Sequence, residues 1–417
     1  MYDRAHHTRH LPSSPSVAFR QPSLRRVSSG IAIALLCAAV VATTGCGSWV
    51  TEDDLVCWFF GGLSDPCWDH FWAPNIKTGG ASAASAGDAL FITASAHATG
   101  AFGTNWRTDI TVHSLGPEAA VFRVLVLLHD SDSGVHDEVE LTLEAGHSVR
   151  LDDILAAEFS IDGTAALVLA PSSGRIIATS RTYNQLTAGN PLGLPTGSTF
   201  GQAIPAQPLG EAVGEGQEGR LVQLSHTQGA AIGSRTNLGL VNATNADINI
   251  VVDLFTSDGV ALGSIGVPLP PAGYRQINRI FERVTRDDVA DGFAIVRTTT
   301  SRGRFFAYAS IVDNLTGDPV AVPATVVPTT PPPGPSDPVT VVASAHAPGA
   351  AGTNWRTDLE IHCWSDHPAE FTIKLLKHGI DNSNAQSRTY TLAAGTSLRL
   401  PDILDTEFGF AGGAALR

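Results

Sequence analysis

An internal repeat is the feature that most constrains the fold of this chain. The motif Gly-Thr-Asn-Trp-Arg-Thr-Asp occupies residues 103–109 and returns unchanged at residues 352–358. Around it, residues 94–167 align with residues 343–416 without a gap, and 36 of these 74 positions are identical. Repetition on this scale is typical of a protein built from copies of one structural module.

A third, more divergent copy lies between the other two. Ser234-Arg235-Thr236-Asn237 stands where Trp106-Arg107-Thr108-Asp109 stands, and Gly303-Arg304 stands where Gly174-Arg175 stands. The sequence therefore predicts three modules in series. The predicted boundaries are a leader at 1–45, an aromatic and cysteine-containing segment with a linker at 46–88, modules at 89–206, 220–323 and 339–417, and a Pro-rich linker at 324–338.

Within the first module, apolar and polar residues alternate over short runs that turn residues separate. This pattern predicts strands at 90–94, 108–113, 120–127, 139–143, 148–151, 165–169 and 175–183. Seven short strands in a module of this length are typical of an Ig-like antiparallel β-sandwich. One segment of each module, at 152–159, 277–284 and 401–408, instead has the apolar spacing of a short crossover helix. We therefore expect an all-β protein of tandem sandwiches, each with its own core and one short helix.

The third module lacks any counterpart of residues 169–184, which include the strand predicted at 175–183. Loss of a strand exposes a sheet edge, which natural proteins avoid. Two interpretations follow: the sequence is a fragment of a longer reading frame, or a partner strand completes the module. We favour the fragment.

The N-terminal residues have the pattern of a bacterial export signal. Arg20, Arg25 and Arg26 precede an uncharged run at 31–44, which is shorter than the ~20 apolar residues of a membrane span and ends at Gly45-Cys46. The small residues before Cys46 resemble a lipobox, although Thr43 stands where Leu is usual. We predict that Cys46 is lipidated and that the exported chain is anchored in the outer membrane or at the cell surface. Ordinary signal cleavage and a retained anchor are the alternatives.

Two further cysteines, Cys57 and Cys67, are expected to form a disulfide in this oxidising compartment. The aromatic rings around them, between Trp49 and Trp72, indicate either a small core of their own or a membrane-interface patch; we favour the small core. Cys363 aligns with Ser114 and is expected to be a half-buried strand thiol.

Charge limits the class of partner. After residue 45 the chain has 21 basic and 39 acidic residues, a balance of −18. Nucleic acid and anionic lipid headgroups bind clusters of Lys and Arg, so we exclude them as partners of this surface.

The repeated motif itself is the first candidate site. Its polar core is Asn105, Trp106, Arg107, Thr108 and Asp109, with a second copy at Asn354, Trp355, Arg356, Thr357 and Asp358. Grouping His97, Asp109 and His113 would give a metal or acid–base cluster. Against this, Asn237 replaces Asp109 in the middle copy, and Asp109 and His113 would lie ~13 Å apart on a strand. We therefore predict a structural role, in which Arg107 pairs with backbone carbonyls or a helix carboxylate.

A second candidate is an acidic loop. Asp130, Asp132 and Asp137 place oxygen atoms as in half of a calcium loop. The bidentate Glu of an EF-hand is missing, so a solvated hairpin tip is the favoured interpretation and calcium the weaker one.

No common catalytic motif is present. The chain resembles tandem β-sandwich repeats in secreted or surface proteins of environmental bacteria. The resemblance covers residues 89–417 and is carried by Arg107-Thr108-Asp109, by Asp152-Asp153-Ile154-Leu155 and by Ser180-Arg181-Thr182-Tyr183. It implies no activity, catalytic residue or cofactor. We expect a non-enzymatic lipoprotein that serves as a stalk or binding array for a protein or glycan; the alternative is a carbohydrate- or calcium-binding accessory region of a larger secreted hydrolase.

Overall fold

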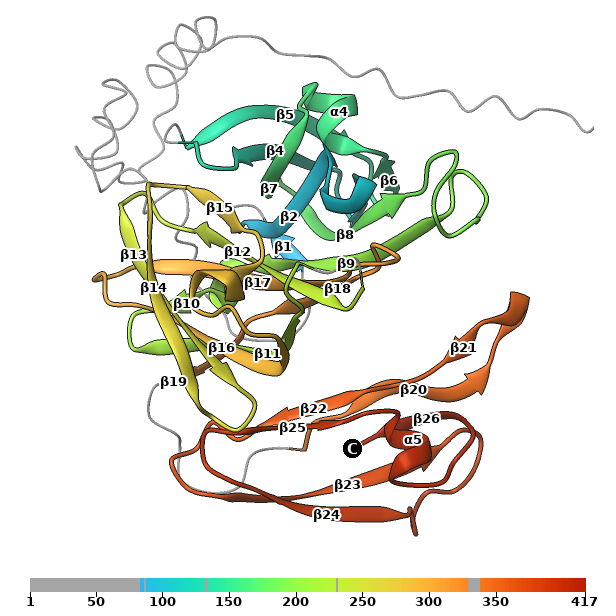
Figure 1. Ribbon diagram of the computed structural model, residues 1–417. Helices are drawn as coiled ribbons and strands as arrows, with labels where there is room; N and C mark the ends of the chain where they lie inside the picture. Colours follow the sequence, from blue (N-terminus) through green and yellow to red (C-terminus); the bar gives the residue numbers. More distant parts are fainter. Residues whose placement is uncertain (1–82, 86–87, 132–133, 230–231, 329–337) are drawn as a thin grey trace, which may run out of the picture. The chain divides into compact units, whose positions relative to one another are not determined.

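The computed structural model describes residues 83–85, 88–131, 134–229, 232–328 and 338–417, all within one compact unit (Figure 1). This part of the chain is all-β, as predicted, and its strands pair antiparallel in several sheets. The leader, Cys46, Cys57, Cys67 and the aromatic segment lie outside the described residues. No helix among the described residues has both the length and the apolar character needed to span a membrane.

The first module confirms all seven predicted strands. Its elements are β1 (Ala83–Ser85), β2 (Leu90–Thr99), η1 (Ala101–Gly103), β3 (Asn105–Ser114), β4 (Ala120–Leu128), β5 (Val135–Leu143), β6 (Ser148–Leu151), α4 (Ile154–Phe159), β7 (Gly163–Ser173), β8 (Arg175–Gln185) and β9 (Thr199–Pro208). One layer runs in the order β5-β4-β7-β2-β9 and the other in the order β9-β8-β3-β6. Strand β9 pairs with both β8 and β2 and so joins the two layers.

The second module repeats this topology. It comprises η2 (Leu209–Glu211), β10 (Val213–Gly214), β11 (Gln217–His226), β12 (Ser234–Asn242), β13 (Ile248–Thr256), β14 (Ala261–Leu269), β15 (Tyr274–Ile277), η3 (Ile280–Arg283), β16 (Val289–Thr298), β17 (Arg304–Asp313), β18 (Pro319–Pro323) and β19 (Thr325–Pro328). Its sheets are β10-β17-β12-β15, with β18 on β17, and β14-β13-β16-β11-β19. In the first module β9 pairs with both layers, whereas in the second module β18 pairs with β17 and β19 pairs with β11.

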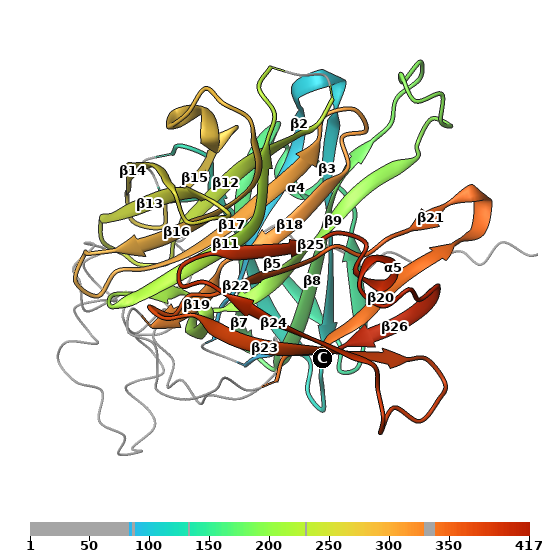
Figure 2. The same ribbon diagram turned by 60° about the horizontal axis from the view of Figure 1, so that its bottom comes forward.

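The third module contains the counterparts of β2 to β7, in the same order. Its elements are β20 (Val341–Pro348), η4 (Ala350–Gly352), β21 (Asn354–Trp355), β22 (Leu359–His362), β23 (Ala369–Lys377), β24 (Ser387–Leu392), β25 (Ser397–Leu400), α5 (Ile403–Thr406) and β26 (Gly412–Leu416). Strands β22 and β25 form a separate two-stranded sheet and lie side by side in both views (Figure 1, Figure 2).

The cores differ from the expectation of one per module. A single buried cluster joins first-module residues such as Phe91 and Phe122 to Tyr274, Phe306 and Tyr308 of the second module. The rings of Phe91 and Phe306 lie 4.8 Å apart, and each residue is 2% exposed. The second module has a further core of its own, and the third module has a smaller one. The first two modules are therefore not independent units, because they bury apolar surface against each other.

One strand and the end of the second module also differ from the sequence-based prediction. Strand β9 was not predicted, and its two prolines, Pro205 and Pro208, weaken the strand pattern. Strand β19 lies inside the segment predicted as a linker from residue 324, yet it pairs with Gln217–Arg220 of β11. The second module therefore extends to Pro328.

Candidate functional site

The repeated motif starts the central strand of the first module. Strand β3 begins at Asn105, and Thr108 on it is fully buried. The Oγ1 atom of Thr108 accepts the N–H of Ala96 at 2.8 Å and lies 2.9 Å from Oγ1 of Thr182 on β8. Thr108 therefore ties β3 to a neighbouring strand on each side.

Asp109 fixes the chain just before helix α4. Its Oδ1 accepts the backbone N–H of Asp153 at 3.0 Å and the hydroxyl of Tyr183 at 3.1 Å, and its Oδ2 accepts Nη2 of Arg150 at 2.6 Å. Asp153 has a left-handed backbone with φ of 46°, which is costly for a residue with a side chain. Asp109 thus stabilises a strained turn, and we call this contact the strand–turn latch.

The carboxylate of Asp153 is itself paired. It lies 2.8 Å from Nδ1 of His97 and 3.1 Å from Nε of Arg107. The predicted pairing of Arg107 with a helix carboxylate is therefore present, at the residue that precedes the helix. Burial and the Asp109 carboxylate raise the pKa of Tyr183 to about 12, so its hydroxyl stays protonated and donates.

The hypothetical metal or acid–base cluster is not assembled. His97 binds Asp153 rather than Asp109, and His113 binds the Oγ of Ser148 at 2.9 Å on the exposed side of the sheet. His97 and Asp109 thus both contact Asp153, through its carboxylate and its N–H respectively, and His113 has a different partner.

The middle module builds the same latch with different residues. Asn237 replaces Asp109, and its Oδ1 accepts the N–H of Arg279, which has φ of 53°. Ser225 donates its N–H to Thr236, as Ala96 donates its N–H to Thr108. The next residue, His226, therefore corresponds to His97. The sequence comparison missed His226, since the offset between the two copies changes by one residue between His226 and Arg235.

Charges in the middle latch are rearranged. Arg279 stands at the place of Asp153, and it forms an ion pair with Glu282. Burial and the charge of Arg279 together lower the pKa of Arg235 to about 10. Arg235 donates to Oδ1 of Asn314 at 2.8 Å and lies over the ring of Phe102 in the first module. The middle copy therefore keeps an arginine at the position of Arg107, but the partner of that arginine is Asn314.

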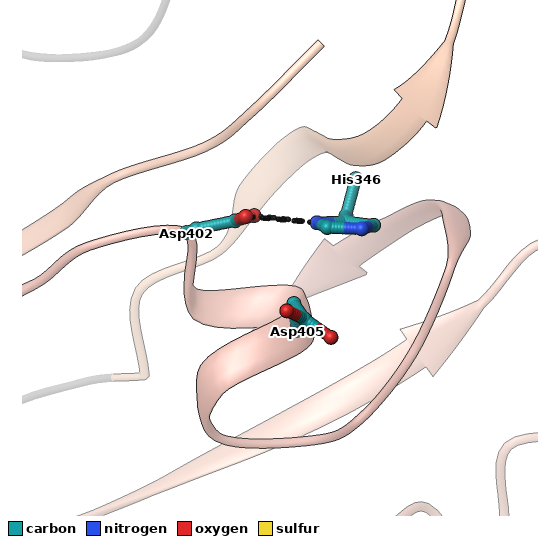
Figure 3. A group of neighbouring side chains, drawn as sticks. All are labelled: His346, Asp402 and Asp405. Carbon is teal, nitrogen blue, oxygen red and sulfur yellow. Dashed lines mark hydrogen bonds and ion pairs between the residues drawn. The ribbon is translucent and has the colours of Figure 1, made fainter. Parts of the chain in front are cut away.

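The third module repeats the latch of the first. Oδ1 of Asp358 accepts the N–H of Asp402 at 3.0 Å, and Asp402 has φ of 46°. The Asp402 carboxylate lies 2.9 Å from Nδ1 of His346 and 2.9 Å from Nε of Arg356. Figure 3 shows His346 facing Asp402, with Asp405 on the helix below them.

His346, Asp402 and Asp405 are close enough to hold a metal ion, since one ligand atom of each lies within 4.8 Å of the others. Arg356 already neutralises Asp402, however, and Ala156 replaces Asp405 in the first module. The shared part of the group is the His–Asp–Arg contact, which is a structural contact in both copies.

The predicted acidic loop is only partly described. Asp130 forms an ion pair with Arg275 of the second module, and Oδ1 of Asp137 accepts the N–H of Glu138 at 2.8 Å. Asp132 lies outside the described residues. Both interpretations of this loop, the favoured solvated hairpin tip and the weaker calcium site, stay predictions.

A hollow beside η1 has a volume of about 230 Å³. Its walls come from η1 and from the segments 184–192 and 314–317, and they include three asparagines and no acidic, basic or cysteine side chain. Asn184, Asn190 and Asn314 each bind neighbouring parts of the chain. The hollow therefore contains no general acid or base.

Cys363 is buried and free, just beyond the end of β22. Its Sγ contacts the carbonyl of His367 at 3.5 Å, as Oγ of Ser114 contacts the carbonyl of Glu118 at 3.4 Å. The thiol thus replaces a hydroxyl in a turn contact, and it is more buried than we expected.

Comparison with known proteins adds little to this geometry. No family model matches the chain, and no curated protein matches it in sequence. Among solved structures, a vicilin from Corylus avellana (hazelnut) is similar over 58% of this chain and 74% of its own, at 7% sequence identity and a TM-score of 0.19. A likeness this weak supports no conclusion about function.

Proposed function

We propose that the chain is a non-enzymatic surface lipoprotein whose tandem Ig-like β-sandwich modules act as a stalk or as an adhesion array. The observation that carries the proposal is the latch. In each module the most polar part of the repeat holds a strained turn against a strand, through Asp109, Asn237 and Asp358. What repeats along the chain is therefore a scaffold contact, with its polar groups bound to one another.

The same observation argues against an enzyme built on the repeated motif. A catalytic carboxylate or imidazole needs an atom free to reach a substrate. Asp109 and Asp153 each have several partners within the protein. We propose that the ligand of the array is a protein or a glycan bound on the outer surface of the modules.

Membrane anchoring tests the localisation. Cells that express the chain are fractionated and treated with external protease, and the wild type is compared with Cys46→Ser and with a control variant, Cys57→Ser. We expect the wild type and the control in the outer membrane fraction and Cys46→Ser in the soluble exported fraction. Membrane retention of Cys46→Ser would refute lipid anchoring at this residue.

Calcium distinguishes the accessory-region alternative. The melting temperature is measured in millimolar calcium and in chelator, for the wild type and for Asp137→Asn. A wild-type melting temperature that is the same in both conditions fits the scaffold proposal. A rise in calcium that Asp137→Asn removes would favour the alternative.

A further inference from the structure

The second and third modules are in contact through two strands of each. Strand β22 lies against β11, and β25 lies against β16. The backbone N–H of Ser397 in β25 donates to the carbonyl of Ser257, just beyond β13, at 2.7 Å. The rings of His362 on β22 and Phe293 on β16 have centroids 4.4 Å apart. In the first module the matching residue, His113, lies on the exposed side of its sheet. The third module therefore uses this face for a contact between modules.

Two carboxyl groups face each other inside this contact. Glu360 comes from β22 and Asp291 from β16. Both carboxylate oxygens of Glu360 and Oδ1 of Asp291 are buried, and no N–H or O–H group of the described chain is placed to donate to them. Two ionised carboxylates in such a place repel each other and have lost their water. One proton shared between them removes the repulsion and supplies a donor, so the contact favours a pair that holds one proton.

A histidine of the same strand is held in the neutral state. Nε2 of His362 lies 3.1 Å from Nη1 of Arg220, and its Nδ1 lies 3.1 Å from Oγ of Ser397. A guanidinium nitrogen only donates hydrogen bonds, so Nε2 has to be the acceptor and to lack a proton. Closing the contact therefore requires a neutral imidazole beside a protonated carboxyl pair.

The surrounding charges act in the same sense. Burial and the charge of Asp291 raise the pKa of Glu360 to about 7, whereas the backbone of Gln223 and the charge of Arg399 oppose this shift. Burial and the charge of Arg220 lower the pKa of His362 to about 4. The charged side chains of the neighbouring strands have partners of their own: Glu218 pairs with Arg220, Arg297 with Asp253, His226 with Glu282 and Arg399 with Asp358.

We propose that the contact between the second and third modules is a separable joint whose closure moves one proton from His362 to the pair of Glu360 and Asp291. When the joint opens, water reaches both groups; Glu360 then releases its proton to solvent and His362 takes one up from solvent. The number of bound protons is the same before and after. The proposal depends neither on the anchor nor on the ligand of the array.

Taken singly, the two groups would make closure depend on pH in opposite directions. Glu360 has a raised pKa in the closed joint, so its contribution to closure is complete below its ordinary pKa of 4.5 and is lost as the pH rises through about 7. His362 has a lowered pKa there, so it opposes closure increasingly as the pH falls from its ordinary pKa of 6.5 to about 4. Each effect changes the closing constant by at most about tenfold per pH unit, and in the shared range they cancel.

Exchange of the Ser397 amide with solvent measures closure, because its hydrogen bond to Ser257 crosses the joint. The protection factor, corrected for the intrinsic exchange rate, is followed from pH 5 to pH 7.5 in the full chain. Wild-type protection should change by at most about threefold. Protection should rise with pH in Glu360→Gln and fall with pH in His362→Gln, by more than about tenfold in each case.

The controls separate this effect from general instability. A chain with both substitutions should show no dependence on pH, and His113→Gln, at the matching position of the first module, should behave as the wild type. Glu360→Thr, which introduces the residue found at Thr111 of the first module, should repeat the result of Glu360→Gln. Amides of β23 report whether the third module is folded in every variant.

Two results would overturn the proposal. One is a pH dependence of the same sign, or none, in the two single variants while β23 stays protected. The other is protection of Ser397 that requires millimolar calcium at pH 7.5, because a cation and not a proton would then neutralise the carboxyl pair.

Discussion

At the residue scale, the three copies of the strand–turn latch can be compared with one another. The strand position is Asp109, Asn237 and Asp358 in the three modules, and each side chain accepts the N–H of a residue with left-handed backbone. The acceptor oxygen is common to all three copies, whereas the negative charge is not. The hydrogen bond should therefore matter more than the charge.

This argument predicts different effects for two substitutions of Asp109. Asp109→Ala leaves the N–H of Asp153 and the hydroxyl of Tyr183 without their acceptor and should lower the free energy of unfolding by about 1–3 kcal/mol. Asp109→Asn keeps an acceptor oxygen and should lose less than half of that amount. Urea denaturation measures both; equal losses would show that the charge on Asp109 is the important property.

His226 gives a prediction about pH. Its side chain is fully buried, and burial together with the charge of Arg279 lowers its pKa below the usual 6.5, although Glu282 and Asp288 oppose this effect. Well above pH 6.5 the His226 side chain is neutral in both the folded and the unfolded chain, so it does not change the stability. As the pH falls below 6.5 the unfolded chain takes up a proton that the folded chain does not, so the free energy of unfolding should decrease, by at most about 1.4 kcal/mol per pH unit, until the folded pKa is passed.

The measurement compares denaturation of the wild type and His226→Leu between pH 7.5 and pH 5. Other groups titrate in both proteins, so the difference between the two curves reports His226. The free energy of unfolding of the wild type, minus that of the variant, should decrease as the pH falls. A difference that is constant with pH would show that His226 keeps an ordinary pKa.

Some of these contacts follow from sequence and others do not. The sequence predicts that Arg107 pairs with backbone carbonyls or a helix carboxylate, and in the structure it contacts both the carbonyl of Trp106 and the carboxylate of Asp153. The left-handed turn at Asp153 was not predicted, because Asp152 and Asp153 also fit the first turn of a helix. The helix instead starts at Ile154. Which acceptor holds the turn depends on the register of β3 with the helix, and no local pattern encodes it.

At the element scale, the alternation of apolar and polar residues predicted the strands well wherever one face of the strand packs on a core. Strand β6 was predicted with its observed ends at Ser148 and Leu151. Strands β9 and β19 were missed, because proline weakens their pattern and because their pairing is decided by distant partners, β8 and β11. The distribution of apolar residues thus predicts which segments are strands better than it predicts which sheet receives them.

A glycine in β12 shows how close two strands must approach. In the register of β12 and β17, Gly239 lies opposite Tyr308. A Cβ atom on Gly239 would lie 1.9 Å from the Tyr308 ring, which is 2% exposed and whose hydroxyl binds Tyr274 and Gln276. The ring is therefore held in place by packing and by two hydrogen bonds.

Gly239→Ala should consequently destabilise the protein by about 1–3 kcal/mol or more, the usual cost of overpacking a core. Gly266→Ala in β14 is the matched control, because nothing lies within 4 Å of a Cβ atom there. Thermal denaturation should show a lower melting temperature for the first variant and little change for the second. Equal melting temperatures would mean that Tyr308 moves aside without cost.

At the scale of the whole molecule, three sequence copies do not give three equivalent units. The repeat predicts three modules, but it does not predict the core that the first two share. Phe91, Tyr274 and Phe306 fit the strand pattern of their own modules, so nothing in one module's sequence shows that its partner is the next module. The first two modules therefore form a stiff pair, because rotation between them would expose buried aromatic rings.

The shared core predicts that the first two modules unfold together. Phe91→Ala removes a buried ring that contacts Phe306 and should cost about 3–5 kcal/mol. Hydrogen exchange in dilute denaturant should then show faster exchange in β12 and β17 of the second module as well as in β3 and β4 of the first. Phe281→Ala creates a cavity in the separate core of the second module. It should likewise speed exchange in both modules.

Strand β23, whose buried residues belong to the third module's own core, serves as the internal reference and should exchange at an unchanged rate in both variants. If exchange in each variant increases only within the mutated module, the two modules fold independently and their contact is a weak one. Joint exchange instead would establish residues 89–328 as one cooperative unit, because a cavity on either side of the contact is then felt across the whole pair.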